Sequence, residues 1–318
     1  MSLNISMTDC ASLYSLLKAI VPGTRLILVG DSNQLPSVGP GNVLKDIIDS
    51  EAFSVVRLSK IYRQAESSHI VLNAHKINAG ELITLNNKNK DFFFFEKQDV
   101  RSVMGALIYL VKTKLPEYIG TSPFEIQVLT PMRKGELGVE HLNEVLQYYL
   151  NPASESKKEK EGRTGVFREG DKVMQVKNNY KLEWKITNEK GFSVEEGLGV
   201  FNGDMGVIKQ INTYSERITV VFDENREVEY PYSNLDELEL AYAITIHKSQ
   251  GSEYPAVVLP LLSGPPILCN RNLLYTAITR AQKCAAIVGR QSMVEQMIHN
   301  ETEQKRYSGL NECLKDGI

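Results

Sequence analysis

The sequence predicts an α/β protein whose parallel sheet is interrupted by a small, strand-rich insertion. Short apolar segments alternate with helix-forming segments over residues 5–150, as in sheets built from strand–helix–strand units. Between residues 164 and 238, short β-branched segments at hairpin spacing replace this alternation, and the first pattern resumes afterwards. We therefore expect two α/β domains, with a small β-barrel inserted into the second one.

The amino-terminal region alternates helix and strand twice. Residues 9–19 predict a helix, and residues 24–30 form a continuous apolar run closed by Gly30-Asp31. Such a run is typical of a buried parallel strand whose carboxyl end opens into a functional loop. Residues 41–48 predict a second helix, and residues 55–58 predict a second strand.

A second α/β unit follows. Residues 67–78 are amphipathic, with apolar side chains along one helix face. Residues 92–95 are four consecutive phenylalanines, which predict a strand buried on both faces; a base-stacking platform is the alternative. A helix at residues 100–114, a strand at 125–130 and a helix at 138–150 complete the unit.

The insertion begins after a change in composition. Residues 154–163 are rich in Lys and Glu without periodicity and predict a solvated linker. Barrel strands are expected at residues 172–176, 206–211, 217–222 and 227–230. After the barrel we expect a strand at 256–260, a helix at 272–281 and a strand at 285–289. The predicted domains are residues 4–60 (part of the first), 61–163 with 239–318 (the second), and 164–238 (the barrel).

Composition limits the classes of protein. The 318 residues are 42% hydrophobic and 24% charged, with a formal net charge of −3, as in ordinary globular proteins. Binding to a polyanion would therefore require a local basic groove. The four cysteines are scattered, which predicts neither a metal site nor a disulfide framework and favours a reducing cytoplasm. Because prolines and a glycine interrupt the longest apolar stretch, residues 256–268, we expect no transmembrane span and no membrane partner. We further expect a cytoplasmic monomer.

One loop concentrates residues with chemical uses. Residues 30–41 read Gly-Asp-Ser-Asn-Gln-Leu-Pro-Ser-Val-Gly-Pro-Gly and follow a predicted parallel strand, where open sheets bind ligands. The amide of Gln34 can hydrogen-bond a phosphate oxygen or a water, and the Gly-Pro-Gly segment can hold a tight, open path. A plain polar connection before a helix explains the same residues. The loop alone leaves both interpretations open.

Four later segments give this loop a context. They are, in chain order, Ile61-Tyr62-Arg63-Gln64, Thr130-Pro131 with Gly135 and Gly138, His247-Lys248-Ser249-Gln250-Gly251-Ser252-Glu253, and Thr279-Arg280-Ala281. Together with the loop, this order resembles motifs III, IV, IVa, V and VI of superfamily 1 helicases. The loop itself is similar to that of the RecD-like branch, the exodeoxyribonuclease V alpha chain family. The resemblance covers residues 5–289.

The resemblance implies RecA-like motor domains, the second complete and the first only partial, with ATP and Mg²⁺ bound between them. The implied catalytic residues are Arg280, Arg63 and Gln34. Gln34 would sense the γ-phosphate, and the two arginines would reach it from the second domain. An arginine supplied across an interface accelerates phosphoryl transfer by about 10³–10⁵. The implied nucleotide-binding set comprises Asp31, Gln34, Arg63, Gly251, Glu253 (near the ribose) and Arg280.

The resemblance also implies a track for single-stranded DNA. The implied DNA-contacting residues are Thr130, Thr245, His247 and Lys248. In the barrel, Lys172, Lys177, Lys181 and Lys185 suit a phosphate track, with Tyr180, Trp184 and Phe201 as stacking candidates. Glu183 and Glu189 are interleaved with these lysines, so a solvated strand face is the open alternative. Subunits of a recombination or nuclease complex are further expected partners.

The chain carries no phosphate-binding loop of its own. It contains no Gly-Lys dipeptide, which every Walker A motif requires. Ile5-Ser6-Met7 matches the end of the family's Walker B segment, but Leu3 and Asn4 stand where the family has Asp and Glu. Residues 220–224 imitate Walker B, yet they lie in the barrel and predict a hairpin turn. We expect the carboxyl-terminal part of a longer helicase, inactive alone and without tightly bound ATP or Mg²⁺.

The leading hypothesis is an ATP-dependent DNA helicase that moves 5′ to 3′ and acts in DNA recombination and repair, of which this chain is the carboxyl-terminal part. A non-catalytic DNA-binding or partner-docking module is one alternative. A subunit of a nuclease complex is another, although no acidic cluster with metal-ligand spacing supports nuclease chemistry in this sequence.

Overall fold

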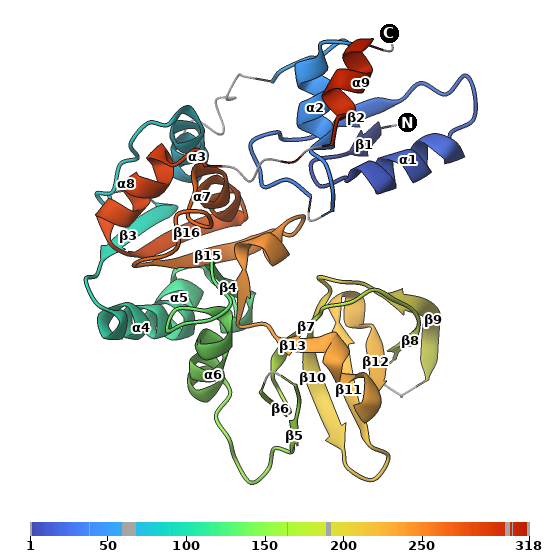
Figure 1. Ribbon diagram of the computed structural model, residues 1–318. Helices are drawn as coiled ribbons and strands as arrows, with labels where there is room; N and C mark the ends of the chain where they lie inside the picture. Colours follow the sequence, from blue (N-terminus) through green and yellow to red (C-terminus); the bar gives the residue numbers. More distant parts are fainter. Residues whose placement is uncertain are drawn as a thin grey trace.

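The computed structural model describes residues 2–37, 39–58, 68–88, 90–163, 165–188, 192–302, 306 and 308–316. These residues form three lobes, seen one above another in Figure 1. We call them the first lobe, where both chain ends lie, the central lobe, and the inserted lobe at the bottom of that view.

The central lobe is built on a five-stranded parallel sheet. Its strand order is β14-β4-β15-β16-β3, and every neighbouring pair is parallel. The strands span Ala243–Thr245 (β14), Ile126–Thr130 (β4), Tyr254–Leu261 (β15), Ala281–Gly289 (β16) and Phe92–Glu96 (β3). The predicted α/β class with a parallel sheet is therefore confirmed.

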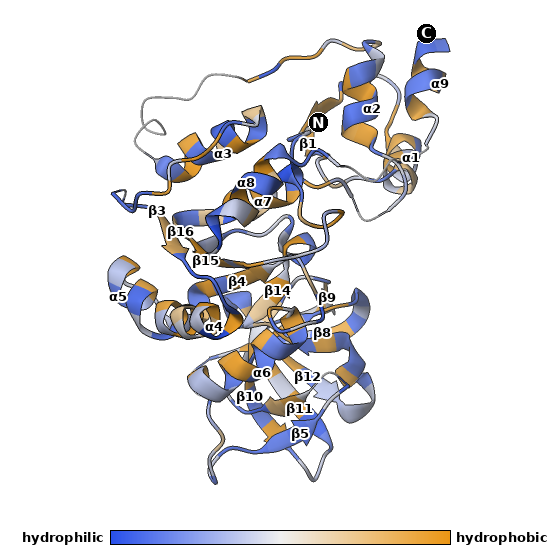
Figure 2. Cartoon of the chain, turned by 60° about the vertical axis from the view of Figure 1, so that its left-hand side comes forward, coloured by the Kyte–Doolittle hydropathy of each residue, from blue (hydrophilic) through white to orange (hydrophobic). Residues whose placement is uncertain are grey.

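Helices cover both faces of this sheet (Figure 1). One face carries α3 (His69–Ala79), α7 (Arg271–Ile278) and α8 (Gln291–His299); the other carries α4 (Val100–Tyr109), α5 (Leu115–Ile119) and α6 (Val139–Leu150). Because successive strand residues point to opposite faces, Val257 and Leu259 join the core beneath the first set of helices. Ala256 and Val258 join the core beneath the second set. Figure 2 shows the hydrophobic strands enclosed between these helices.

Polar caps fix where several helices begin. Asp9 accepts a hydrogen bond from the backbone of Ser12 at 2.7 Å and starts α1 (Cys10–Ala19). Ser68 caps α3, and Asp99 caps α4. These starts confirm the helices predicted at residues 9–19, 67–78 and 100–114. No helix in the described part of the chain is long and apolar enough to cross a membrane.

The run of four phenylalanines forms β3, at one edge of the central sheet. Phe92 and Phe94 are buried in the core beneath α3 and α7. Phe93 and Phe95 pack against the opposite core, beneath α4 and α6. Since all four rings pack on protein, the predicted buried strand is confirmed over the base-stacking platform.

The first lobe is small and only partly covered. It contains α1, α2 (Val43–Ser50), and a two-stranded parallel sheet of β1 (Ser2–Asn4) and β2 (Ile27–Val29). The strand predicted at residues 24–30 is correct in kind but wrong in burial, since Ile27 and Val29 are 53% and 50% exposed. These two side chains share one face of β2, whereas Leu28, between them, packs against the core of the first lobe. The strand expected at residues 55–58 is wrong, because this segment is irregular and exposed.

The carboxyl end of the chain returns to the first lobe. Helix α9 (Leu310–Asp316) lies against α2 in Figure 1. The Ser308 hydroxyl donates to the Asp46 carboxylate at 2.6 Å, and the Asn311 amide donates to the Asp46 carbonyl at 3.2 Å. Arg306 donates to the carbonyl of Gly39 at 2.6 Å. The carboxyl-terminal helix thus packs on the first lobe; the predicted domain boundaries stay predictions.

The inserted lobe is one antiparallel sheet with the strand order β13-β7-β10-β11-β12-β8-β9. Its strands are β7 (Lys172–Gln175), β8 (Asn179–Thr187), β9 (Ser193–Val200), β10 (Met205–Asn212), β11 (Arg217–Phe222), β12 (Glu227–Pro231) and β13 (Leu238–Leu240). Within the described residues the end strands β13 and β9 do not pair, so the sheet is open where a closed barrel was predicted. The β11–β12 connection is the hairpin turn expected at Asp223 and Glu224, which confirms that this acidic pair is no Walker B strand.

Two features of the insertion were not expected. The linker at residues 154–163 contains a short strand, β5 (Glu159–Glu161), paired with β6 (Val166–Arg168). The long β8–β9 hairpin was also missed, although Leu182, Trp184 and Ile186 alternate with charged residues along β8 as strand residues do.

Candidate nucleotide site between the first and central lobes

The loop after β2 contacts the helix that precedes Arg280. The Tyr275 hydroxyl, on α7, donates to Asp31 Oδ2 at 2.8 Å. The next residue of α7, Thr276, accepts a hydrogen bond from the backbone of Leu35 at 2.9 Å through its Oγ1. Two successive residues of α7 thus hold the Gln34 loop of the first lobe against the central lobe.

The segment before β15 holds the same loop from another side. Gln250 Nε2 donates to the carbonyl of Leu35 at 2.5 Å and to that of Pro36 at 3.4 Å. Gly251 follows with φ +81°, a left-handed conformation that favours glycine. A Cβ placed there would lie 3.6 Å from the sulfur of Met7, so the first lobe reaches this segment as well.

Asp31 organises the loop from inside. Its Oδ1 accepts from the Asn33 backbone at 3.0 Å, and its Oδ2 accepts from Gln34 Nε2 at 3.1 Å. The Ser6 hydroxyl accepts from the Asp31 backbone at 2.9 Å. Asp31 Oδ2 therefore serves Gln34 of the first lobe and Tyr275 of the central lobe at once.

Arg280 is folded back into the central lobe. Its side chain is only 6% exposed. The guanidinium donates to the carbonyl of Ser252 at 3.1 Å, to that of Thr276 at 3.3 Å, and to the Thr279 hydroxyl at 3.4 Å. Burial lowers the pKa of Arg280, and the negative charges of Glu253 and Asp31 oppose this shift. The carbonyls and nearby acids thus compensate a buried cation that lies within electrostatic range of the Gln34 loop.

The remaining predicted nucleotide residues have different placements. Glu253 is exposed, and its carboxylate accepts from Gln282 Nε2 at 3.2 Å. Arg63 lies outside the described residues. The structure therefore brings Asp31, Gln34, Gly251 and Arg280 to one boundary between lobes and sets Glu253 on the solvent side of it.

Three predicted DNA-contacting residues lie at the carboxyl end of β14. Thr245 caps the short 3₁₀ helix Ile246–Ser249 by accepting from the backbone of Lys248 at 3.3 Å. The His247 side chain is exposed, and partial burial together with the charge of Arg306 lowers its pKa. Lys248 Nζ lies 3.5 Å from Glu239, and burial is the main cause that lowers the Lys248 pKa.

Thr130 lies at the same edge of the sheet as Thr245, but it is buried. In the sheet it is the partner of Thr245, so the two predicted DNA residues end neighbouring strands. Thr130 is fully buried, its hydroxyl donates to the carbonyl of Leu137 at 2.7 Å, and it accepts from the backbone of Met132 at 3.4 Å. Its side chain holds the loop after β4 and does not face solvent.

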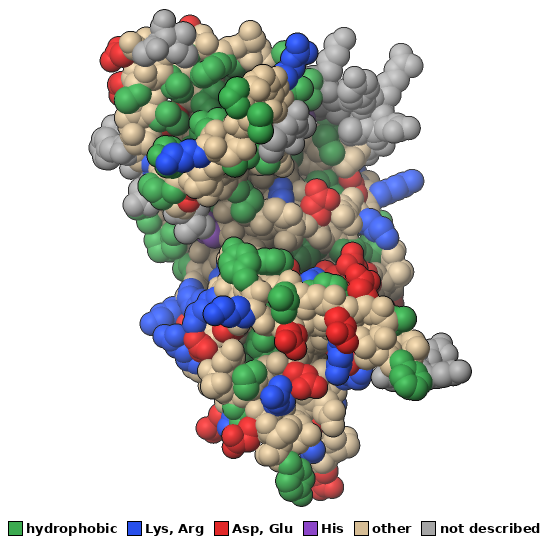
Figure 3. Space-filling model, turned by 90° about the vertical axis from the view of Figure 1, so that its right-hand side faces the viewer, with side chains coloured by type: hydrophobic (Ala, Val, Ile, Leu, Met, Phe, Trp, Pro, Cys, Tyr) green, Lys and Arg blue, Asp and Glu red, His purple; other side chains and the backbone are tan. Residues whose placement is uncertain are grey.

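The lysines of the inserted lobe do not form one basic track. Lys172 is 7% exposed and donates to the carbonyl of Phe124 at 2.6 Å and to Gln127 Oε1 at 2.8 Å, so its assignment to a phosphate track is wrong. Lys177 is paired with Asp236, and Lys185 lies 4.0 Å from Glu229. Figure 3 shows Lys and Arg interspersed with Asp and Glu over the lower part of the molecule.

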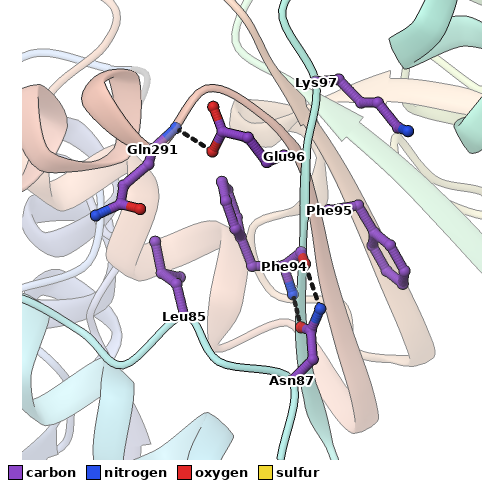
Figure 4. Close-up of a pocket in the computed structure, with 7 residues that line it drawn as sticks. All are labelled: Leu85, Asn87, Phe94, Phe95, Glu96, Lys97 and Gln291. Atoms are coloured by element: carbon purple, nitrogen blue, oxygen red, sulfur yellow. Dashed lines mark hydrogen bonds between the residues drawn. The ribbon is translucent and has the colours of Figure 1, made fainter.

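A separate hollow of about 490 Å³ lies along β3 and is shown in Figure 4. Asn87 donates to the carbonyl of Phe94 and accepts from its backbone nitrogen, both at 2.6 Å. Glu96 accepts from the backbone of Gln291 at 3.1 Å. These polar groups are already paired within the protein, so we assign the hollow no ligand.

The sequence did not predict Tyr275 and Thr276, the two residues of α7 that bind the Gln34 loop. Tyr275 and Thr276 lie inside the segment Leu-Leu-Tyr-Thr-Ala-Ile-Thr-Arg-Ala, where their apolar neighbours indicate only a buried helix. A hydroxyl pair within such an apolar helix, one helical turn before an arginine, is the signal that could have identified them, since buried hydroxyls require partners.

Three family models match the chain in order. They are an AAA domain at residues 4–92, an ATP-dependent RecD-like DNA helicase SH3 domain at 142–222, and a UvrD-like helicase C-terminal domain at 240–288. A solved structure of the Pif1 helicase from Bacteroides in complex with ADP-AlF3 and ssDNA is similar over 93% of this chain and 71% of that one. Its TM-score is 0.50 and its sequence identity 19%, so this similarity concerns the fold.

Two curated relatives extend the match. The ATP-dependent RecD2 DNA helicase of Deinococcus radiodurans is 35% identical over 278 residues, which cover 87% of this chain and 34% of that protein. The RecBCD enzyme subunit RecD of Mycobacterium tuberculosis is 30% identical over 329 residues, covering 98% of this chain and 52% of that protein. The chain thus spans about a third and about half of these relatives' lengths. Together, the ordered models and these matches show that the chain is similar over most of its length to RecD-like DNA helicases.

Proposed function

We propose that this chain supplies one side of the ATP site, and part of the single-stranded DNA track, of an ATP-dependent 5′–3′ DNA helicase acting in recombination or repair. The main support for the proposal is that the Gln34 loop is hydrogen-bonded directly to α7, the helix before Arg280, across the boundary between the lobes. A contact of this kind lets phosphate chemistry on one lobe change the position of the other.

The residues present fit one side of a triphosphate site. Charge spreads over the phosphate oxygens in phosphoryl transfer, and a guanidinium with planar donors stabilises it. Arg280 would supply those donors after leaving the carbonyls of Ser252 and Thr276. Gln34 would supply an amide after leaving Asp31. The sequence contains no Gly-Lys dipeptide, so in this proposal residues outside it cradle the phosphates.

Mg²⁺ does not fit the residues in hand. In the described ranges no group of three His, Cys, Asp or Glu side chains could hold a metal ion. We therefore derive no step through Mg²⁺ from this chain. The RecD-like helicases imply ATP and Mg²⁺ in the complete machine, and in this proposal the metal ligands lie on the side of the site that holds the phosphates.

The DNA track would follow the edge where β4 and β14 end. His247 is exposed there, and Lys248 lies beside it with Glu239 as its partner. A base can stack on the imidazole ring, and the ammonium can attract a phosphate. Because Arg133 also binds Glu239 at 2.7 Å, this acid would hold two cations at the edge of the track.

A second candidate is the same ATP-driven role within a multi-subunit nuclease, with this chain's protein as one subunit. The match to a RecBCD enzyme subunit over 98% of this chain favours it. Co-purification of the untagged partners with the intact protein would separate this candidate from a helicase that acts as a monomer.

Steady-state ATP hydrolysis with and without single-stranded DNA tests the proposal. The intact protein that carries this sequence should hydrolyse ATP, with stimulation by DNA, whereas the 318-residue chain alone should not. DNA-stimulated hydrolysis by the chain alone, abolished by Arg280→Ala, would refute the half-site assignment. An intact protein that binds DNA without hydrolysing ATP would instead support a non-catalytic DNA-binding module.

A further inference from the structure

The Asp31 carboxylate is the point where the two lobes share one acceptor. Its Oδ2 receives Tyr275 Oη at 2.8 Å from the central lobe and Gln34 Nε2 at 3.1 Å from its own loop. We propose that Tyr275 is a positioning residue: its hydroxyl latches Asp31 to α7 and so keeps Gln34 and Arg280 in a restrained arrangement until DNA binding rearranges the lobes. This inference rests on the proposed function.

Both groups that the proposed reaction needs are occupied inside the protein. The Gln34 amide donates to Asp31. The Arg280 guanidinium donates to the Ser252 and Thr276 carbonyls and is 6% exposed. Each must break these contacts before it can reach a phosphate. An arrangement that satisfies both groups internally therefore restrains hydrolysis.

Thr276 transmits the state of the latch to Arg280. Its Oγ1 accepts from the Leu35 backbone at 2.9 Å, and its carbonyl accepts from Arg280 Nε at 3.3 Å. Tyr275 and Thr276 are adjacent on α7, so the loop is bound to the same turn that holds the arginine. A displacement of the loop would therefore shift Thr276, whose carbonyl accepts the hydrogen bond from Arg280.

The hydrogen bond from Tyr275 to Asp31 is not expected to break when the Tyr275 hydroxyl is exposed to neutral pH. Burial, followed by the charge of Asp31, raises the pKa of Tyr275 well above that of a free phenol. The hydroxyl consequently remains a donor, and a hydrogen bond from a hydroxyl to a carboxylate is among the stronger kinds. Movement of the lobes, and not titration of Tyr275, is then what releases it.

The chain offers a matched control. Tyr254 is 7% exposed and its backbone nitrogen donates to the Arg280 carbonyl at 2.8 Å, so it lies in the same neighbourhood. Among the described residues its hydroxyl makes no hydrogen bond to the first lobe. Tyr254→Phe therefore makes the same chemical change as Tyr275→Phe without removing a bond between the lobes.

The first measurement is ATP hydrolysis by the intact protein, with and without single-stranded DNA. In Tyr275→Phe we expect the DNA-free rate to rise about tenfold, the size of effect that losing one charge-assisted hydrogen bond gives. The DNA-saturated rate should stay within about twofold, so the stimulation ratio falls. Tyr254→Phe should keep the unmodified ratio. Equal loss of both rates in Tyr275→Phe, or an unchanged ratio, would overturn the latch.

The second measurement does not depend on catalysis. Backbone amide hydrogen–deuterium exchange of residues 31–35 should become about tenfold faster in Tyr275→Phe and stay unchanged in Tyr254→Phe. Unchanged exchange in Tyr275→Phe would overturn the latch whether or not the protein hydrolyses ATP. If exchange rises but no variant hydrolyses ATP, the latch stands as a lobe contact while the proposed function fails.

Discussion

Lys172 provides the most quantitative test of the structure, because it is a buried cation without a carboxylate in hydrogen-bond contact. Its ammonium donates to the Phe124 carbonyl and to Gln127 Oε1, and its side chain is 7% exposed. Burial lowers the pKa of Lys172 from 10.5 to about 7, and the charges of Asp223 and Glu125 only partly oppose this. In the unmodified chain we expect the free energy of unfolding to rise with pH, and we predict that Lys172→Met abolishes this rise.

The magnitude follows from linkage. Between pH 7 and 10.5 the unfolded chain keeps the proton on Lys172 while the folded chain releases it. The free energy of unfolding therefore rises with pH in this window, and this gain is lost as the pH falls back through about 7. At about 1.4 kcal/mol per pH unit, the gain between pH 7 and pH 9 is about 2 kcal/mol. Methionine at this position does not titrate. It leaves two acceptors without a donor, each costing about 1–3 kcal/mol at every pH.

Urea denaturation at pH 7, 8 and 9 measures this difference. The single tryptophan, Trp184, reports on the inserted lobe by fluorescence, and far-ultraviolet circular dichroism reports on the whole chain. The difference in unfolding free energy between the unmodified chain and Lys172→Met should grow by about 2 kcal/mol from pH 7 to pH 9. Lys177→Met, which removes an exposed lysine paired with Asp236, should leave the pH dependence unchanged. Parallel profiles for the unmodified chain and Lys172→Met would refute the reasoning.

Three further changes test other parts of the structure. Thr276→Val removes the acceptor of a buried Leu35 amide and should lower the unfolding free energy by about 1–3 kcal/mol in urea denaturation, with Thr279→Val as a milder control at a less buried position. Gly251→Ala places a side chain at φ +81° and should cost about 1–2 kcal/mol by the same measurement; a stability equal to that of the unmodified chain would contradict the left-handed conformation. Lys248→Ala should reduce the slope of log affinity for single-stranded DNA against log salt by about 0.7, measured by fluorescence anisotropy, and an unchanged slope would remove Lys248 from the proposed track.

Local patterns were sufficient for the central lobe. The apolar runs that became β4, β15 and β16 are buried on both faces, and a continuous apolar run is the pattern that a doubly covered parallel strand leaves in a sequence. Helix starts were equally readable, because Asp9 and Asp99 supply caps through contacts three residues along the chain. These predictions depend on neighbours in sequence and therefore did not need the fold.

Burial at lobe boundaries was not predictable in the same way. The run at residues 24–30 is as apolar as the central strands, yet Ile27 and Val29 are exposed on one face of β2, and only Leu28 packs against the core of the first lobe. Lys172 is charged, yet it is buried where its ammonium binds a backbone acceptor from the 3₁₀ helix Pro123–Glu125 and an amide acceptor from β4. In both cases the deciding contacts come from distant segments, which no local pattern encodes.

In the candidate site, too, local motifs were predictable from the sequence, whereas contacts between distant segments were not. The motif order identified Gln34 and Arg280 as candidates, but the contact between Tyr275 and Asp31 joins residues 244 positions apart. Only the packing of the first lobe on the central lobe creates that contact. The predicted roles of Asp31, Gln34, Gly251, Glu253 and Arg280 stay predictions for experiment.

In the proposed function, Arg280 acts on ATP phosphates that residues outside this sequence hold. Single-turnover ATP hydrolysis by the intact protein, saturated with single-stranded DNA, tests it most directly. Arg280→Gln should lower the hydrolysis rate by about 10³ or more while ATP affinity stays within a few-fold. Arg271→Gln, at the start of the same helix and bound to the Ile298 carbonyl at 2.6 Å, should retain the unmodified rate. A hydrolysis rate for Arg280→Gln within tenfold of the unmodified protein would contradict the account.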